Sequence, residues 1–397
     1  MAFRILSLDG GGSWALIQVR ALMTLYGEAT SGHQVLRNFD LAAANSGGSL
    51  VLAGLVEDLP LSEILRYFRD EPKRRSIFSP TRNLIDAGLQ ATLGIGPKYS
   101  AAAKLPALRA LLPNSGDRPL AGIAGGLASP GSNPQHLLIA GFDYDTNRAV
   151  FFRSATTGRA GIWGEGAATA ATLAAAVHAS TNAPVNYFDA PAAVPEMLDR
   201  FWDGAITGCN NPCVAAIVEA LTLGQDPHDI HVLSLGTGSV VLPLAAPGAA
   251  GSALQPARTN SALTTDLRKL ATAILDDPPD VASFIAHAIT GANAGLAAPL
   301  GSRVVRMSPL ISPRASNGGW VAPAGWSNTQ FQHLCNIDMD AVTQSDVDYI
   351  ESYCGYWLAD QAPNQPIRMN RATLAPELGH AAFGDARAAW RLLFPLV

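Results

Sequence analysis

One stretch of the chain, from Phe39 to Ala53, constrains the possible fold more than any other. An apolar run at 41–44 ends at Asn45-Ser46, and two glycines lead directly into a second apolar run at 49–53. This pattern predicts a strand that passes into a helix without a loop, and such a junction forces one residue into a tight, strained bend. A serine at the bend raises its hydroxyl above the edge of the sheet, where small neighbours let a substrate approach. The stretch therefore suggests a nucleophile elbow with Ser46 at its centre.

The match to the elbow pattern is incomplete. The expected sequence is G-x-S-x-G, whereas this chain has Ala44-Asn-Ser-Gly-Gly48. Alanine is small enough for the packing, but it adopts positive φ angles less readily than glycine. The alternative is an ordinary buried strand followed by a helix that Ser46 or Ser49 caps. The stretch by itself leaves both interpretations open.

Composition limits the classes of function. With 397 residues, 48% of them hydrophobic, the chain can bury a large core in one large domain or two smaller ones. A net charge of -5 gives no polybasic field, so nucleic acid is not an expected partner. No apolar run reaches the ~18 residues that span a bilayer. A strand at 3–8 would begin almost at Met1, so we expect no secretory signal and a cytoplasmic location, with peripheral membrane contact at most.

The four cysteines are typical of reduced thiols. They form no C-x-x-C pair and no cluster with histidine at the spacing of a zinc site. We therefore expect free cysteines, and neither a metal nor another cofactor. The residues are Cys209, Cys213, Cys335 and Cys354.

A second candidate site follows the first predicted strand. Phe3–Leu8 runs into Asp9-Gly-Gly-Gly-Ser13, and apolar residues at helical spacing continue to Tyr26. Backbone N–H groups at such a turn can hold a phosphate or the oxyanion of an acyl-transfer intermediate. The stretch Gly10–Ala15 also fits the dinucleotide fingerprint G-x-G-x-x-A. Against an oxidoreductase, no convincing acidic residue ends a second strand ~20 residues further on.

The rest of the chain alternates strands with helices. Apolar strands are predicted at 136–142, 149–152, 231–235 and 303–307. This alternation favours a three-layer α/β/α fold with a mostly parallel central sheet, in which ligands bind at the carboxyl ends of strands. The predicted strand ends include Gly10–Gly12, Ser46 and Asp203.

The segment 59–134 interrupts this alternation with irregular pieces rich in glycine and proline. An insertion of this size is usually functional or mobile. We therefore consider it a candidate lid over Ser46 or a surface that faces the substrate. Helices packed permanently on the sheet are the alternative. The features that suggest a lid are the basic run Lys73-Arg-Arg75 and the apolar residues Phe78, Leu84, Ile85, Leu89, Leu93 and Ile95.

Three motifs match one family in order and in spacing. They are Asp9-Gly-Gly-Gly12 after the first strand, the elbow serine, and Asp203-Gly-Ala205 followed by Asn210-Asn-Pro212. The chain resembles the patatin-like phospholipases, which are lipid acyl hydrolases with a Ser-Asp dyad. Further stretches that look like family landmarks are 98–100, 179–184 and 233–238.

The resemblance covers roughly residues 3 to 310. It implies a catalytic domain at 1–310, with the motifs within 3–213 and the candidate lid at 59–134. Residues 311–397 would then be a mostly helical segment packed on the same domain.

The resemblance also implies roles for individual residues. Ser46 matches the nucleophile, Asp203 the general base, and Gly10, Gly11 and Gly12 the loop that forms the oxyanion hole. The implied substrate is a phospholipid or another acyl ester, met at a membrane or micelle surface and cleaved without a cofactor.

Two departures from the family pattern keep other interpretations open. Trp14 stands where the family usually has arginine, and Ala44 stands where it has glycine. A non-catalytic lipid-binding relative therefore remains an alternative. His178 is an alternative base, although a lone histidine near the end of an alanine-rich helix is more often a surface or capping residue. An aspartate becomes a better base when burial raises its pKa above ~3.9.

Overall fold

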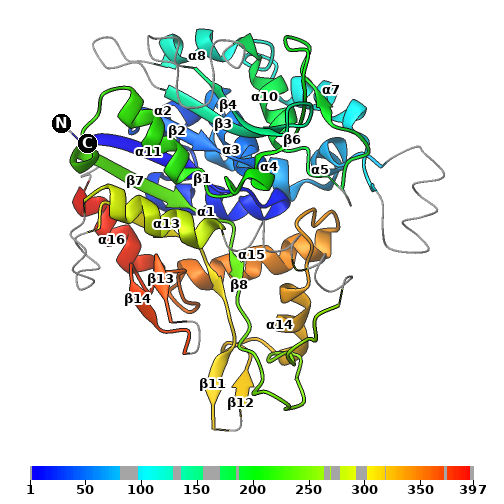
Figure 1. Cartoon of the computed structure of the whole chain (residues 1–397), viewed down its shortest axis with the longest axis vertical. Helices are drawn as coiled ribbons and strands as arrows, with labels where there is room; N and C mark the ends of the chain where they lie inside the picture. The colour runs from blue at the N-terminus through cyan, green and yellow to red at the C-terminus, as the bar shows by residue number, and fades with distance from the viewer. Residues whose placement is uncertain are drawn as a thin grey trace.

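A mixed sheet forms the centre of the molecule. The computed structural model describes residues 2–80, 97–127, 136–154, 170–184, 187–262, 269, 278–291, 302–317, 319–370 and 373–393. The strands of the central sheet in these ranges are β1 (Phe3–Leu8), β2 (Leu41–Ala44), β3 (His136–Asp143), β4 (Arg148–Arg153), β5 (Ala192–Ala193), β6 (Arg200–Asp203), β7 (Ile230–Leu235) and β9 (Val304–Met307). Their order is β5-β6-β3-β2-β1-β7-β9, and β4 also pairs with β3 (Figure 1).

The sheet is mostly parallel, as the sequence predicts. β3, β2, β1, β7 and β9 run in one direction, whereas β4, β5 and β6 lie antiparallel to their neighbours. Buried apolar residues on both faces explain the continuous hydrophobic runs of the central strands. The carboxyl ends of β1 and β2 are adjacent, since Leu8 pairs with Ala44. The residues that follow these two strands therefore meet at one edge of the sheet.

Helices cover both faces of the sheet. The helices that precede β3 in the chain are α1 (Leu16–Tyr26), α2 (Gly32–Leu36), α3 (Ser46–Val56), α4 (Leu61–Arg69), α5 (Glu71–Ile77), α7 (Ala101–Leu111) and α8 (Leu120–Leu127). Another helix, α10 (Leu173–Ser180), lies between β4 and β5 in the chain. Of these, α1, α3, α4 and α10 contribute to the larger apolar cluster, whereas α11 (Cys213–Thr222) and α13 (Pro278–Ile289) contribute to the cluster on the opposite face. Short 3-10 helices are η1 (Gly12–Ala15), η2 (Gly204–Thr207) and η3 (Pro227–Asp229). The three-layer α/β/α expectation is confirmed.

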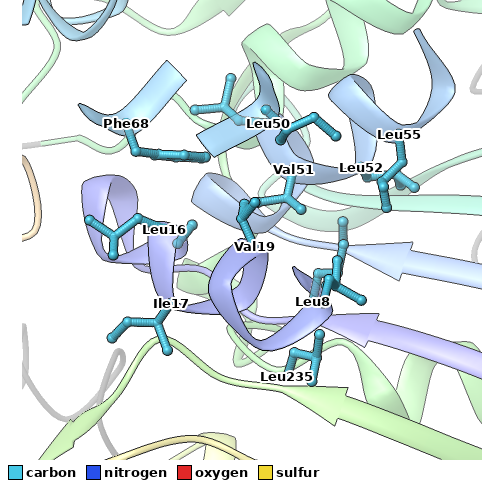
Figure 2. Close-up of a cluster of buried hydrophobic side chains, with 14 of the residues drawn as sticks. Leu8, Leu16, Ile17, Val19, Leu50, Val51, Leu52, Leu55, Phe68 and Leu235 are labelled. Carbon is cyan, nitrogen blue, oxygen red and sulfur yellow. The ribbon is translucent and has the colours of Figure 1, made fainter. Parts of the chain in front are cut away.

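Side chains of β1 point alternately to the two faces of the sheet and contribute to both apolar clusters. Leu6 and Leu8 belong to the larger apolar cluster, whereas Phe3 and Ile5 belong to the cluster on the opposite face. Figure 2 shows Leu8 and Leu235 below the labelled apolar side chains of α3, whereas Phe68 of α4 is at the upper left of the same cluster. Because α3 begins at Ser46, this packing fixes the position of the elbow.

The C-terminal segment adds helices and short strand pairs. Its elements are β11 (Arg314–Ser316), β12 (Gly319–Val321), α14 (Asn328–Cys335), α15 (Gln344–Leu358), β13 (Arg368–Met369), β14 (Pro376–Leu378) and α16 (Phe383–Leu393). Just before it, β10 (Leu310–Ile311) pairs with β8 (Ser239–Val240). Tyr353 and Trp357 of α15 are fully buried in the same cluster as α1 and α3. The segment thus shares the core of the preceding residues. Its short strand pairs were not predicted from the sequence.

The candidate lid is described only in part. Leu61, Leu65 and Leu108 from α4 and α7 are buried in the main core. Arg74 of the basic run is also buried, and its guanidinium donates to backbone oxygens of the chain, so this arginine does not face a lipid surface. The apolar residues between Leu84 and Ile95 lie outside the described residues, so the lid stays a prediction. No helix in the described ranges is long and apolar enough to cross a membrane.

Candidate active site

The stretch around Ser46 forms a sharp strand-to-helix bend. β2 ends at Ala44, and α3 begins at Ser46, whose φ of 46° lies in the left-handed region. This strain is the feature expected of an elbow residue. The alternative of a serine cap is wrong, because Asn45 is the N-cap residue and Ser49 donates its hydroxyl to the Ser46 carbonyl oxygen at 2.6 Å. Ala44 does not need glycine at its position, since its φ angle is negative.

Asp203 lies across from Ser46 at the end of β6. Its carboxylate oxygen Oδ1 accepts hydrogen bonds from the Ala205 N–H at 2.9 Å and from the Asn45 amide at 3.1 Å. Its own N–H donates to the carbonyl oxygen of Asn182. Burial raises the pKa of Asp203, and hydrogen bonding from the Ser46 hydroxyl is the largest of the opposing influences. The structure therefore brings together the two side chains predicted as nucleophile and base.

The glycine loop packs directly against the elbow. A Cβ added to Gly47 would lie 2.4 Å from the Gly12 carbonyl oxygen, so only glycine permits this approach. The Gly10 N–H donates to the Asn210 carbonyl oxygen at 2.8 Å and is not available to a substrate. Among the described residues, the N–H groups of Gly11 and Gly12 have no acceptor. The Asn210-Asn-Pro212 motif thus supports the glycine loop through the Asn210 carbonyl oxygen.

Comparison with known proteins decides the family. The family model described as patatin-like phospholipase matches residues 6–217, just over half of the 397-residue chain. The chain belongs to the patatin-like phospholipase family. At the level of the family, its activity is that of a lipid acyl hydrolase. The match gives no support to the dinucleotide-binding alternative.

One solved structure illustrates how far the overall likeness extends. The crystal structure of VipD from Legionella pneumophila is similar with a TM-score of 0.35 and 10% sequence identity. The aligned region covers 89% of this chain and 67% of that one. No curated protein sequence matches the chain.

A buried ion pair anchors the residue that precedes the glycine loop. Oδ2 of Asp9 lies 2.6 Å from the Arg306 guanidinium, and both side chains are 3% exposed. Burial raises the pKa of Asp9 to about 6, and Arg306 opposes this rise. Arg306 also donates to Ser234 and Gln365. Asp9 precedes the glycines, so the pair fixes where the loop leaves β1.

Replacing Arg306 with methionine should destabilise the fold strongly. The substitution leaves the Asp9 carboxylate buried without its counter-charge, and breaking a buried pair in this way costs about 3–5 kcal/mol. Denaturant unfolding would measure the loss. Arg200→Met is a matched control, because the exposed Arg200–Asp145 pair should contribute little. Equal stability of the two variants would show that the buried pair does not support the loop.

Lys104 is a site residue that the sequence interpretation missed. It is fully buried on α7, where its Nζ donates to Asn182 Oδ1 at 2.9 Å and lies 3.7 Å from the centre of the Phe188 ring. Burial lowers the pKa of Lys104 well below its usual range, and Asp203 opposes this shift. A lysine in an alanine-rich helix normally suggests a solvent-exposed face, so no local signal could have revealed it.

His178 lies near Lys104, in surroundings that make it a weak proton acceptor. It is 3% exposed on α10, and burial together with Lys104 lowers its pKa to about 2. It is therefore neutral throughout the useful pH range. Within the described residues its Nδ1 has no hydrogen-bond partner. A positioned base would be oriented by such a bond.

A small pocket opens at Ser46. Its volume is about 20 Å³, close to the space of a single water molecule. The lining is mostly apolar, as expected for a site that receives an acyl chain. It comprises Gly12, Ser46, Gly47, Leu50, Ile77, Phe78, Thr181, Ala183, Tyr187, Phe188 and Met339.

Proposed function

We propose that this protein hydrolyses carboxylic esters of lipids, with Ser46 as nucleophile and Asp203 as general base. The observation that carries the proposal is the left-handed Ser46 at a strand-to-helix bend facing a buried Asp203 carboxylate. A serine hydroxyl is a weak nucleophile until a base accepts its proton. A carboxylate whose pKa is raised by burial is a stronger base than a solvated one.

The reaction proceeds through an acyl-enzyme. Ser46 Oγ attacks the ester carbonyl carbon while its proton passes to Asp203. The tetrahedral intermediate collapses, the leaving alcohol takes the proton from Asp203, and the acyl group remains on Ser46. Asp203 then accepts a proton from a water molecule that attacks the acyl carbon, which releases the fatty acid and restores the serine.

The N–H groups of Gly11 and Gly12 are suited to bind the oxyanion of that intermediate. Both lack an acceptor within the described part of the chain, and Gly12 lines the pocket with Ser46. One such donor contributes roughly 3–4 kcal/mol to the transition state. Gly10 has a different role from the one its motif implies, because its N–H anchors the loop to Asn210.

The apolar pocket favours an acyl chain as the bound part of the substrate, either of a phospholipid or of a neutral ester. Such a substrate would be met at a membrane or micelle surface. The non-catalytic alternative rests on Trp14 and Ala44. The Trp14 indole N–H donates to the Asp338 carbonyl oxygen, and Ala44 ends β2 in ordinary strand geometry. Neither residue displaces the proposed nucleophile, base or oxyanion donors.

Labelling with a fluorophosphonate probe tests the proposal, because only an activated serine reacts. We expect the native protein to be labelled on Ser46 and to lose labelling after heat denaturation. Absence of labelling on the folded protein would favour the non-catalytic lipid-binding relative.

The charge of Lys104 should shift the acidic limb of the pH profile, whose position depends mainly on the burial of Asp203. Protonated Lys104 favours the ionised form of Asp203 and thereby lowers the Asp203 pKa. In Lys104→Met the pKa of Asp203 should rise, so kcat/KM should begin to fall at a higher pH than in the wild type. The pH dependence of kcat/KM on a soluble ester measures the shift. Lys73→Met, on α5, is the control and should leave the profile unchanged, and an unshifted profile in Lys104→Met would contradict the assignment.

A further inference from the structure

We propose that a strap formed by residues 337–343 determines which acyl groups reach Ser46, and that Met339 is the residue that limits their length. The inference rests on the proposed function of Ser46 and specifies the substrates of that same site. The strap connects α14 to α15 and lies outside the part of the chain that matches the patatin-like phospholipase family model. It is thus a feature of this chain beyond the matched region.

The backbone of the strap is bonded to the glycine loop. The Ser13 N–H donates to the Met339 carbonyl oxygen at 2.8 Å, and the Ser13 hydroxyl donates to the Asp340 carbonyl oxygen at 2.5 Å. The Trp14 indole N–H adds a bond of 3.3 Å to the Asp338 carbonyl oxygen. Trp14, which replaces the usual arginine, therefore contacts the strap. These bonds place Met339 beside Gly12, where it lines the pocket together with Ser46.

Side chains from residues 98, 99 and 187 hold the strap as well. Lys98 Nζ lies 3.0 Å from an Asp338 carboxylate oxygen and 3.2 Å from one of Asp340. The Tyr99 hydroxyl donates to Asp340 at 2.6 Å, and the Tyr187 hydroxyl donates to Asp338 at 2.7 Å. The strap is therefore bonded both to the glycine loop and to these three side chains, and its position is well defined.

Met339 is a half-buried, unbranched side chain in the wall of the pocket. The pocket of about 20 Å³ is small for an acyl chain, so movement of a lining side chain would enlarge the space available to it. Leu50, Ile77 and Phe188 are nearly fully buried in the apolar clusters, and moving them would disturb the core. Met339 is only half-buried, and methionine is unbranched with three rotatable bonds. Its size therefore limits the space available beyond Ser46.

Chain-length profiles of Met339 variants test this inference. The kcat/KM of the full-length protein would be measured on p-nitrophenyl butyrate and p-nitrophenyl octanoate, both below their micelle concentrations. Met339→Ala should raise the octanoate-to-butyrate ratio by about 10-fold or more, because a few methylenes in a pocket discriminate by that amount. Met339→Phe should lower the ratio, and Met339→Leu should leave it near the wild-type value. The bulky variant keeps the test decisive if the alanine variant does not fold.

The controls separate this inference from the proposed function. Met197→Ala removes a partly buried methionine that does not line the pocket, and its ratio should equal that of the wild type. If the wild type is not labelled by a fluorophosphonate, the proposed function fails. If it is labelled but Met339→Ala and Met339→Phe keep the wild-type ratio, the strap inference alone is overturned.

Discussion

Replacing Ser46 with alanine is expected to abolish ester hydrolysis, with a loss of at least about 10⁴-fold in kcat, while the fold is kept. The substitution removes the only atom that would form the acyl-enzyme. The bonds that position the residue are made by its backbone, since the Ser46 N–H donates to Ser180 Oγ and the Ser46 carbonyl oxygen accepts from Ser49. Alanine retains both backbone hydrogen bonds, and its conformational strain in the left-handed region is similar to that of serine. The melting temperature should therefore stay close to that of the wild type.

The measurement is hydrolysis of a chromogenic medium-chain ester, with melting followed by circular dichroism. Ser154→Ala provides a matched control at another buried serine, whose hydroxyl oxygen accepts a bond from the Leu137 N–H. That variant should lose some stability and keep its activity. Most of the wild-type activity in folded Ser46→Ala would show that Ser46 is not the nucleophile.

Asp203→Asn is expected to be as damaging as Ser46→Ala. Asparagine has nearly the same shape but cannot accept the serine proton, so Ser46 would lack its base. The two losses should not add in the double variant, because residues that act as one unit are non-additive. Kinetics of the two single variants and the double variant on the same ester would test this expectation.

The alternative base provides the contrasting outcome. His178→Ala should cost much less activity than Asp203→Asn, because burial and Lys104 lower the pKa of His178 and make it a weak proton acceptor. If folded His178→Ala were inactive while Asp203→Asn stayed active, histidine would be the base and the Ser-Asp dyad would be wrong.

Asp203→Asn should also retain or gain stability at neutral pH. Burial raises the pKa of Asp203, so the folded state binds a proton more readily than the unfolded state. Above the pKa of the folded state, the ionised carboxylate therefore destabilises the fold, and this cost disappears as pH falls through that pKa. The neutral asparagine avoids the cost at pH 7. A melting temperature well below that of the wild type at neutral pH would contradict this explanation.

The sequence by itself determined the elements that depend on local pattern. The predicted strands at 3–8 and 41–44 coincide with β1 and β2, because short apolar runs bounded by glycine or asparagine give a clear strand signal. The strand-to-helix junction at Ser46 follows from the same local information, whereas the choice between an elbow and a serine cap was left open until the structure showed Asn45 as the N-cap residue. Parallel neighbours then bring the ends of β1 and β2 to one edge of the sheet.

Only the tertiary structure decided which distant groups complete the site. Arg306 lies in a strand whose pattern gives no sign of a partner, and Lys104 lies in a helix that suggests solvent exposure. Arg306 is buried in an ion pair with Asp9, and buried Lys104 donates to Asn182 and is influenced by the charge of Asp203, all far away in the sequence. The hydrogen bond from the Gly10 N–H to the Asn210 carbonyl oxygen could not be predicted either, because a motif specifies residues and not their hydrogen-bond partners.

The strap at 337–343 is the clearest example of this limit. Its residues carry no motif, and they contact the glycine loop across more than three hundred positions of sequence. The spacing of apolar residues and the residues that favour turns depend on near neighbours in the sequence, so they determine helices, strands and bends. The electrostatics and the shape of the pocket arise from contacts between distant segments, and those contacts exist only after the chain has folded.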